Sequence, residues 1–182
     1  MTEREQIQFS RVWAMPNKWT FQMEPIAKLL GRFITNPNKW ADPFAGTSVW
    51  ASVSNDLNPE RGAVHSMDAL LFLKKQKTET FDGVLFDPPY SPQQVIESYE
   101  GVGLPVPPGA TRADYYTKLK REIARITKPG GVVISFGWNS GGIGKCLGFR
   151  LFEIMLVAHG GHHNDTVVTV ERKIQYRLEA GD

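Results

Sequence analysis

The stretch "FDGVLFDPPY", which spans Phe81–Tyr90, joins an apolar run to an acid, two prolines and an aromatic residue. Its first part, Phe81–Phe86, has the length and apolar character of a strand that is buried on both faces of a sheet. Pro88 and Pro89 then end the strand, because proline has no backbone N–H to donate to a neighbouring strand. The stretch therefore predicts a buried strand that presents the carboxylate of Asp87 at its end.

Helical and strand patterns alternate along the rest of the chain. Apolar residues at helical spacing predict helices over Glu24–Ile34, Met67–Gln76 and Ala113–Lys128. Strands are expected over Lys39–Asp42, Ala51–Leu57, Val132–Trp138, Phe149–Gly160 and Asp165–Lys173. The segment Ser91–Arg112 is rich in proline and glycine and is expected to be a long loop, and Gly141–Gly148 a glycine-rich connection or a short helix.

This alternation predicts an α/β fold with a mostly parallel, twisted sheet and helices on both faces. The two closing strands predict one antiparallel strand at the sheet edge. In open sheets of this kind, ligands bind beyond the carboxyl ends of the strands, where Asp42, Asp56, Asp87 and Trp138 fall. A single acid at such a position is commonly a turn residue or a helix cap. Three acids at successive strand ends instead indicate a ligand site.

Composition sets the broad class of protein. The 182 residues suit one domain, and 41% hydrophobic with 22% charged residues is ordinary for a soluble globular protein. A net charge of +2 is compatible with nucleic acid without proving it. The single cysteine, Cys146, excludes an internal disulfide and fits a reducing, cytoplasmic compartment. The polar N-terminus and the lack of a long apolar run predict no signal peptide and no membrane contact.

Two short motifs carry a resemblance to a known family. "DPFAG" at Asp42–Gly46 and "DPPY" at Asp87–Tyr90 resemble the cofactor and catalytic motifs of S-adenosylmethionine-dependent DNA amino-methyltransferases. "NDLNPE", "MDAL" and "FQMEPIAKLL" resemble their acidic, adenine-packing and amino-terminal cofactor segments, in the order of the gamma group. "TNPNKWADPFA", "DPPYSPQQV", "ISFGWNSGGIGK" and "HGGHHNDTVVTVERK" are more closely similar to small adenine-specific methyltransferases of phages and mobile elements.

The resemblance covers nearly the whole chain, and it implies a Rossmann-like class I methyltransferase. The chain would form a single methyltransferase domain over residues 1–182, without a separate target-recognition domain. It would transfer a methyl group from S-adenosyl-L-methionine to the N6 amine of adenine in DNA, in the cytoplasm of a bacterial host cell. Three alternatives stay open: methylation of cytosine N4, methylation of RNA, and binding of nucleic acid without catalysis. A homodimer also stays open.

The resemblance implies a catalytic role for the turn Asp87, Pro88, Pro89 and Tyr90. The Asp87 carboxylate and the Pro88 carbonyl can each accept one N6–H, which localises the lone pair of the amine. Because proline has no N–H, the turn offers carbonyls without a competing donor. Tyr90 would stack on the target base once that base has left the duplex. The alternative for Tyr90 is an aromatic residue of the core.

The implied cofactor site combines the acids with small and aromatic residues. Its members would be Phe21, Asp42, Phe44, Ala45, Gly46, Asp56, Leu57, Asp68, Ala69 and Asp87. Asp56 should accept from the ribose hydroxyls, or it belongs to a turn before Pro59. Asp68 should accept from the cofactor adenine, or it caps the following helix.

On the target side, the resemblance points to Trp138, Asn139, His162, His163 and Arg112. Packing and turn formation are equally good explanations for Trp138 and Asn139, and a polar hairpin for the histidines. We expect no metal site, because no matching cysteine or carboxylate pair accompanies the histidines and methyl transfer from a sulfonium needs no metal.

The cofactor loop departs from the family pattern in two ways. Ser48 stands where the family has a second glycine, so the sequence is "FAGTS". Few residues separate this loop from the next strand, too few for a full-length helix. The first crossover should therefore be short or irregular.

Overall fold

The computed structural model describes residues 6–161 and 163–174. The strands are β1 (Gln8–Trp13), β2 (Trp40–Asp42), β3 (Val53–Ser54), β4 (Phe81–Phe86), β5 (Thr127–Gly137), β6 (Phe149–Ala158) and β7 (Thr166–Lys173). The helices are α1 (Glu24–Phe33), α2 (Ala69–Lys75), α3 (Pro92–Glu100) and α4 (Ala113–Ile126). The strands form one sheet in the order β1-β6-β7-β5-β4-β2-β3.

The predicted buried strand is β4, and it lies between β5 and β2 in the sheet. Val84 and Leu85 are completely buried, as expected for a strand covered on both faces. Gly83 is required here, because a Cβ at this position would overlap the indole of Trp40 on β2. The strand that carries Asp87 is therefore held rigidly by its neighbours.

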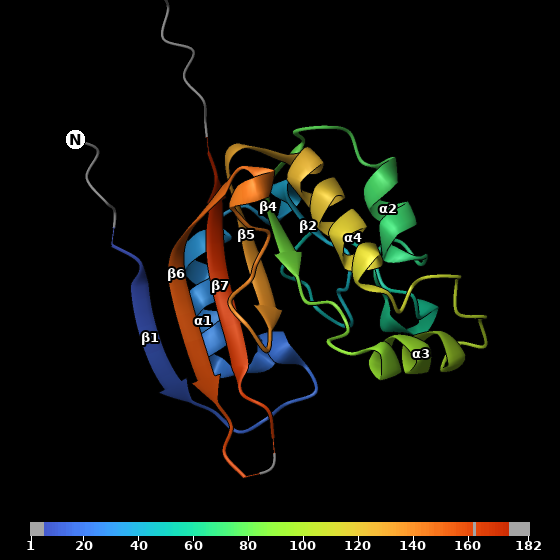
Figure 1. Cartoon of the computed structure of the whole chain (residues 1–182), viewed down its shortest axis with the longest axis horizontal. Coiled ribbons are helices and arrows are strands. Elements are labelled where there is room, and N and C mark those ends of the chain that lie inside the picture. The colour runs from blue at the N-terminus through green and yellow to red at the C-terminus, as the bar shows by residue number, and fades with distance from the viewer. Residues whose placement is uncertain (1–5, 162, 175–182) are drawn as a thin grey trace, which may run out of the picture.

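Helices cover both faces of the sheet, which confirms the predicted α/β architecture. On one face, Ile26 and Leu30 of α1 pack in a cluster with Ile134 and Val168 of the sheet. On the other face, α2 and α4 pack over β4 and β5, with Ile123 of α4 at the centre of that cluster (Figure 1). Within the described residues, no helix is both long and apolar enough to cross a bilayer.

The single antiparallel strand is β7, but it does not lie at the edge. It pairs antiparallel with both β5 and β6, so it occupies the interior of the sheet. The edge belongs to β1, which pairs in parallel with β6 and was not predicted. The order of strands in a sheet depends on pairing between segments that are far apart in sequence. Because β6 and β7 are consecutive, the sequence predicts that they pair with each other, but it does not predict that β1 pairs with β6 or that β5 pairs with β7.

The prediction of a continuous loop over 91–112 was wrong, because α3 begins directly after the turn Asp87–Tyr90. The Ser91 hydroxyl caps it by accepting from the Gln94 N–H at 3.2 Å, and Pro92 suits its first turn. Prolines and glycines dominate only after Gly101. The short first crossover is confirmed, since no helix connects β2 with β3, and β3 itself is shorter than expected.

Candidate active site

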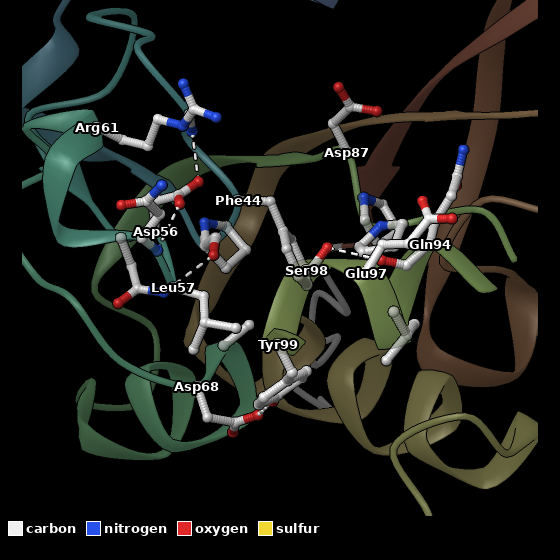
Figure 2. Close-up of a pocket in the computed structure, with 18 of the residues that line it drawn as sticks. Phe44, Asp56, Leu57, Arg61, Asp68, Asp87, Gln94, Glu97, Ser98 and Tyr99 are labelled. Carbon is white, nitrogen blue, oxygen red and sulfur yellow. Dashed lines mark hydrogen bonds between the residues drawn. The ribbon is translucent and has the colours of Figure 1, made fainter. Parts of the chain in front are cut away.

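A cavity of about 460 Å³ lies beyond the carboxyl ends of β2, β3 and β4. In Figure 2, Asp87 lies at one end of this cavity, which we call the main pocket, and Asp68 and Tyr99 lie at the other. Asp56 and Leu57 form one wall, and residues of α3 form the opposite wall. The main pocket therefore lies at the switch point between β2 and β4, where chain connections leave in opposite directions.

The loop after β2 forms the floor of the main pocket. Asp42 is fully buried beneath this loop, where its Oδ1 accepts from the Phe44 N–H at 3.1 Å and its Oδ2 has no hydrogen-bond partner among the described residues. Burial raises the pKa of Asp42 well above its ordinary value, and the nearby carboxylates of Asp87 and Asp56 act in the same direction. Gly46 has a φ of +53°, so the turn of this loop favours glycine.

Asp56, at the end of β3, holds the loop in place. Its carboxylate accepts from the Gly46 N–H at 2.9 Å and from the Asn58 N–H at 2.8 Å. The turn predicted as the alternative role of Asp56 is therefore present, and the same carboxylate lines the main pocket.

Asn55 is a site residue that the sequence did not reveal. It is fully buried, and its side-chain amide donates to the carbonyls of Pro43 at 3.1 Å and Met67 at 3.0 Å. These bonds join the loop after β2 to the segment before α2. Its position directly before a predicted site acid was the only available signal.

Asp68 caps α2 and also connects three elements. Its Oδ1 accepts from the Leu71 N–H at 2.9 Å, which confirms the predicted alternative of a helix cap. Its Oδ2 accepts from the hydroxyls of Tyr99 on α3 at 2.6 Å and Tyr115 on α4 at 2.7 Å. Burial, with the Asp68 carboxylate adding to it, raises the pKa of both tyrosines, so that both hydroxyls remain donors.

The other predicted cofactor residues gather around the same space. Phe44, Leu57 and Ala69 line the main pocket. Phe21 and Ala45 line an adjoining recess of about 240 Å³, which shares Gly46, Asp56 and Asp87 with the main pocket. Of the predicted set, only Asp42 lies beneath the surface of these cavities.

Asp87 follows β4 directly, and it lines both the main pocket and the adjoining recess. The Tyr90 hydroxyl donates to Asp87 Oδ1, and the Thr20 hydroxyl also hydrogen-bonds the carboxylate. Burial raises the pKa of Asp87, while these two bonds oppose the rise. The Tyr116 hydroxyl of α4 donates to the Pro89 carbonyl and holds the turn against that helix.

A smaller cavity of about 140 Å³, the aromatic recess, lies on the other side of the turn Asp87–Tyr90. It shares Pro88, Tyr90 and Tyr116 with the main pocket, and it is further lined by Phe86, Lys120, Ser135, Phe136, Gly137, Trp138, Asn139 and Gly142. The ring centroids of Tyr90 and Trp138 are 5.6 Å apart. Trp138 remains about half exposed at 47%.

Tyr116 and Lys120 were not predicted as site residues. They lie four positions apart on α4 and therefore on the same side of the helix. The packing of α4 against the turn Asp87–Tyr90 brings them to the aromatic recess.

Hydrogen bonds to Glu171 of β7 hold the loop that carries Trp138 in place. The Glu171 carboxylate is buried and accepts from the N–H groups of Ile143 and Gly144, the latter at 2.9 Å. Burial raises the pKa of Glu171. A Cβ at Gly142 would overlap this carboxylate, which explains a glycine at that position.

Two of the predicted target residues lie away from these cavities. Arg112 is the N-cap residue of α4, and His163 lies in the turn between β6 and β7, and neither is among the residues that line the pockets. His162 lies outside the described residues. His159 is structural, because its ring bonds the Ala14 carbonyl at 3.0 Å and the Thr166 hydroxyl at 2.9 Å. In 6–161 and 163–174, no group of three or more His, Cys, Asp or Glu side chains could hold a metal ion.

Comparison with solved structures identifies the class of fold. The chain matches TrmN from Thermus thermophilus with a TM-score of 0.55 and 18% identity, over 84% of this chain and 49% of that one. It matches the Burkholderia thailandensis 1,6-didemethyltoxoflavin-N1-methyltransferase, with S-adenosylhomocysteine bound, at 0.55 and 14% identity, over 84% and 78%. A SAM-dependent methyltransferase from Methanosarcina mazei gives 0.54 and 8% identity, over 81% and 98%.

The chain therefore has the Rossmann-like fold of class I S-adenosylmethionine-dependent methyltransferases. At these identities the likeness concerns the fold, and the chain spans about half the length of the Thermus protein. No protein-family model matches the sequence, and no curated protein sequence does.

Proposed function

We propose that this protein transfers a methyl group from S-adenosylmethionine to the N6 amine of adenine in DNA. The observation that carries the proposal is the position of the turn Asp87–Tyr90, which separates the main pocket from the aromatic recess. A methyl donor and a flipped base need two adjoining sites with a reactive group between them. Tyr90 lines both cavities, and its hydroxyl donates to the carboxylate of Asp87, which lines the main pocket.

The main pocket suits a cationic cofactor. Its volume of about 460 Å³ lies in the range of small-molecule sites, which is roughly 300–1,000 Å³. Its charged lining consists of the carboxylates Asp56, Asp68, Asp87 and Glu97 with the single guanidinium of Arg61. This excess of negative charge complements a sulfonium and an ammonium group.

Three parts of the cavity would hold the three parts of the cofactor. Asp56 would accept from the ribose hydroxyls, as an acid after the second strand does in nucleotide-binding folds. Leu57 and Ala69 offer apolar contact for the adenine ring. Gly46, at the junction with the adjoining recess, leaves room for the methionine chain.

The chemistry depends on two acceptors around one nitrogen. S-adenosylmethionine supplies an electrophilic methyl group, and the exocyclic amine of adenine is a weak nucleophile because its lone pair is delocalised into the ring. The Asp87 carboxylate and the Pro88 carbonyl would accept its two N–H groups and localise that lone pair. The nitrogen would then form the new N–C bond as the bond between the methyl carbon and the sulfonium sulfur breaks, which leaves the neutral thioether S-adenosylhomocysteine. One N–H proton would pass to Asp87 or to water. Holding two reactants in line contributes roughly 7–11 kcal/mol to such a step.

The aromatic recess would receive the target base. Tyr90 and Trp138 offer rings for stacking, and stacking offsets part of the few kcal/mol that unstacking a base costs. In this structure the Tyr90 hydroxyl donates a hydrogen bond to the Asp87 carboxylate. The incoming amine would replace that hydroxyl as the donor to Asp87, so the carboxylate stays hydrogen-bonded throughout.

Incubation with isotopically labelled cofactor and unmethylated DNA, followed by nucleoside mass spectrometry, tests the proposal. We expect N6-methyladenine from the wild-type protein and a loss of several orders of magnitude in turnover from Asp87→Ala, with cofactor affinity changed much less. The matched control is Asp82→Ala on the same strand, whose carboxylate binds Lys128 at 2.6 Å at the opposite end of β4. Its turnover should stay near the wild-type value.

Other products would redirect the proposal. N4-methylcytosine would transfer the same geometry to cytosine, and product only from RNA would replace DNA as the substrate. Absence of any product, with cofactor bound, would support a protein that binds nucleic acid without catalysis. Wild-type turnover from Asp87→Ala would overturn the catalytic assignment.

A further inference from the structure

The edge strand β1 presents an apolar stripe to solvent. Successive side chains of a strand point to opposite faces, and the outward positions of β1 and its flanks are Ile7, Phe9, Arg11, Trp13 and Met15. The four apolar members are 46%, 67%, 63% and 68% exposed in that order. Such a run on alternate positions differs from the singly scattered apolar residues of ordinary surfaces.

The neighbouring strands extend this stripe into a sheet face. Phe9 pairs with Ile154 of β6, Arg11 pairs with Leu156, and Leu156 pairs with Val167 of β7. Paired residues lie on the same face, and these three residues of β6 and β7 are only partly buried. We call Ile7, Phe9, Arg11, Trp13, Met15, Ile154, Leu156 and Val167 the β1 face.

No described helix covers the β1 face. Figure 1 shows α1 behind β6 and β7, whereas α2, α3 and α4 lie to the side of β4. The cluster beneath α2 and α4 includes Phe149 at the start of β6 and no residue of β1. Described helices therefore cover both faces of the sheet at β4 and β5, but only one face at β1 and β6.

The size of the β1 face suits an interface. Aromatic side chains carry about 150–250 Å² each, so the exposed parts of the face amount to on the order of 600 Å². The largest apolar patch of a typical monomer is about 300–600 Å², and a stable interface buries about 800 Å² on each partner. The backbone edge of β1 is also unpaired among the described residues, and no proline or lysine within Gln8–Trp13 protects it.

We propose that a second copy of this chain covers the β1 face, giving a two-fold symmetric homodimer. The face is self-complementary, because it holds seven apolar side chains and a single cation, Arg11, with no acid. Across a two-fold axis, each Arg11 can lie against the partner's Trp13 as a cation–π pair. Nucleic acid fits this face poorly, because phosphate binding requires several cations and the face offers one.

The dimer would leave both reaction sites open. β1 is the first strand in the sheet order and β2 and β3 are the last, so the main pocket lies at the opposite side of the sheet. None of the residues of the β1 face lines the main pocket or the aromatic recess. The inference therefore does not depend on the proposed methyl transfer.

Light scattering coupled to size exclusion, on the full chain over a concentration series, measures the mass directly. We expect twice the chain mass of 20.4 kDa for the wild-type protein and the monomer mass for the double variant Phe9→Lys/Trp13→Lys. Val64→Lys is the matched control, since Val64 is 66% exposed and lies elsewhere, and it should remain dimeric. A wild-type monomer at every concentration, or a double variant that remains dimeric, would overturn the proposal.

Hydrogen exchange of the wild-type protein gives a test that needs no variant. Amides of residues 7–15 should become less protected on dilution below the dimer dissociation constant, while amides of β4 should not change. Protection that is independent of concentration would mean that the chain itself, or nothing, covers the β1 face, and it would also overturn the proposal.

Discussion

Asp87 and Tyr90 are joined by one hydrogen bond, in which Asp87 lines the main pocket and Tyr90 lines both the main pocket and the aromatic recess. The sequence assigned Tyr90 to stacking through its ring, and the structure adds a role for its hydroxyl. The ring also packs against the core beside β5. Tyr90 can therefore both pack against the core and offer its ring to a target base, and substitutions can separate the role of the ring from the role of the hydroxyl.

Tyr90→Phe and Tyr90→Ala should differ strongly in target binding. The phenylalanine variant retains the ring and loses only a hydroxyl that the target amine would replace, so we expect turnover within a few-fold of wild type. The alanine variant loses the stacking surface, worth about 1–3 kcal/mol for a base on an aromatic ring. Single-turnover methylation over a DNA concentration series measures both. Equal defects in the two variants would show that the hydroxyl, and not the ring, carries the function.

Asp42→Asn should stabilise the cofactor-free protein at neutral pH. Because the folded-state pKa of Asp42 is raised, its contribution to stability is complete below the ordinary value of about 3.9 and is lost as pH rises through the raised value. The variant has no charge at this buried position, so its advantage over wild type should grow as pH rises from about 3.9 towards the raised pKa, and then level off. Thermal melts over this pH range, without cofactor, measure the difference.

Asp82→Asn is the control for that experiment, because the pKa of Asp82 is shifted in the opposite direction from that of Asp42. The hydrogen bond and charge of Lys128 lower the pKa of Asp82, so its contribution is present above the ordinary value and lost as pH falls. This variant should gain nothing at neutral pH. If Asp42→Asn showed no pH-dependent advantage, burial would not be penalising the Asp42 carboxylate.

At the scale of elements, the loop after β5 and the hairpin of β6 and β7 act as one unit. Glu171 projects from β7 and fastens the loop that carries Trp138. The aromatic recess therefore depends on a carboxylate that does not line it. We interpret Glu171 as a positioning residue for target binding.

Glu171→Gln should raise the KM for DNA and leave cofactor affinity unchanged. Glutamine has one acceptor oxygen in place of two, so one of the buried N–H groups of Ile143 and Gly144 would lose its partner, at a cost of about 1–3 kcal/mol. Steady-state kinetics with calorimetry of cofactor binding separates the two effects. Glu153→Gln is the matched control, because buried Glu153 on β6 pairs with Arg32 of α1 on the other face. It should lower stability without raising KM.

At the scale of the whole molecule, few surfaces remain for reading a DNA sequence. With the proposed catalytic core set aside, the segment 101–112 and the turn between β6 and β7 remain among the described residues. Side chains that read base edges usually come from a helix or a ribbon placed in the major groove. Cations do lie near the cavities: Lys18 and Arg61 flank the Trp19 ring at 5.1 and 4.9 Å, and Lys120 lines the aromatic recess.

We therefore predict low sequence specificity and binding dominated by phosphate contacts. Affinity for duplex DNA should fall steeply with salt, with about −0.9 in the log–log slope for each phosphate neutralised. Lys120→Gln should reduce the slope by about one phosphate. Fluorescence anisotropy over a salt series measures the slope, and long-read sequencing of methylated DNA measures the site. Recovery of one long, invariant motif at near-complete occupancy would contradict this prediction.

The sequence by itself determined the elements whose signals are local. The apolar run of β4, the periodicity of α1, α2 and α4, and the turn residues after β2 and β4 predicted the α/β class and the edge of the sheet where ligands bind. The acids at the strand ends followed from the same local patterns. These features were predictable because a strand end or a helix cap depends on residues only a few positions apart.

Only the tertiary structure decided which distant segments meet. The interior position of β7, the edge strand β1, and the approach of Asn55, Tyr116, Lys120 and Glu171 to the cavities all arise from pairing and packing across long separations. The helix α3 was hidden by prolines and glycines that follow it. Asp68 accepts hydrogen bonds from Tyr99 of α3 and Tyr115 of α4, which its own sequence neighbourhood does not predict. Such contacts depend on the order of strands in the sheet and on where each helix packs, and a single sequence read in local windows does not contain that information.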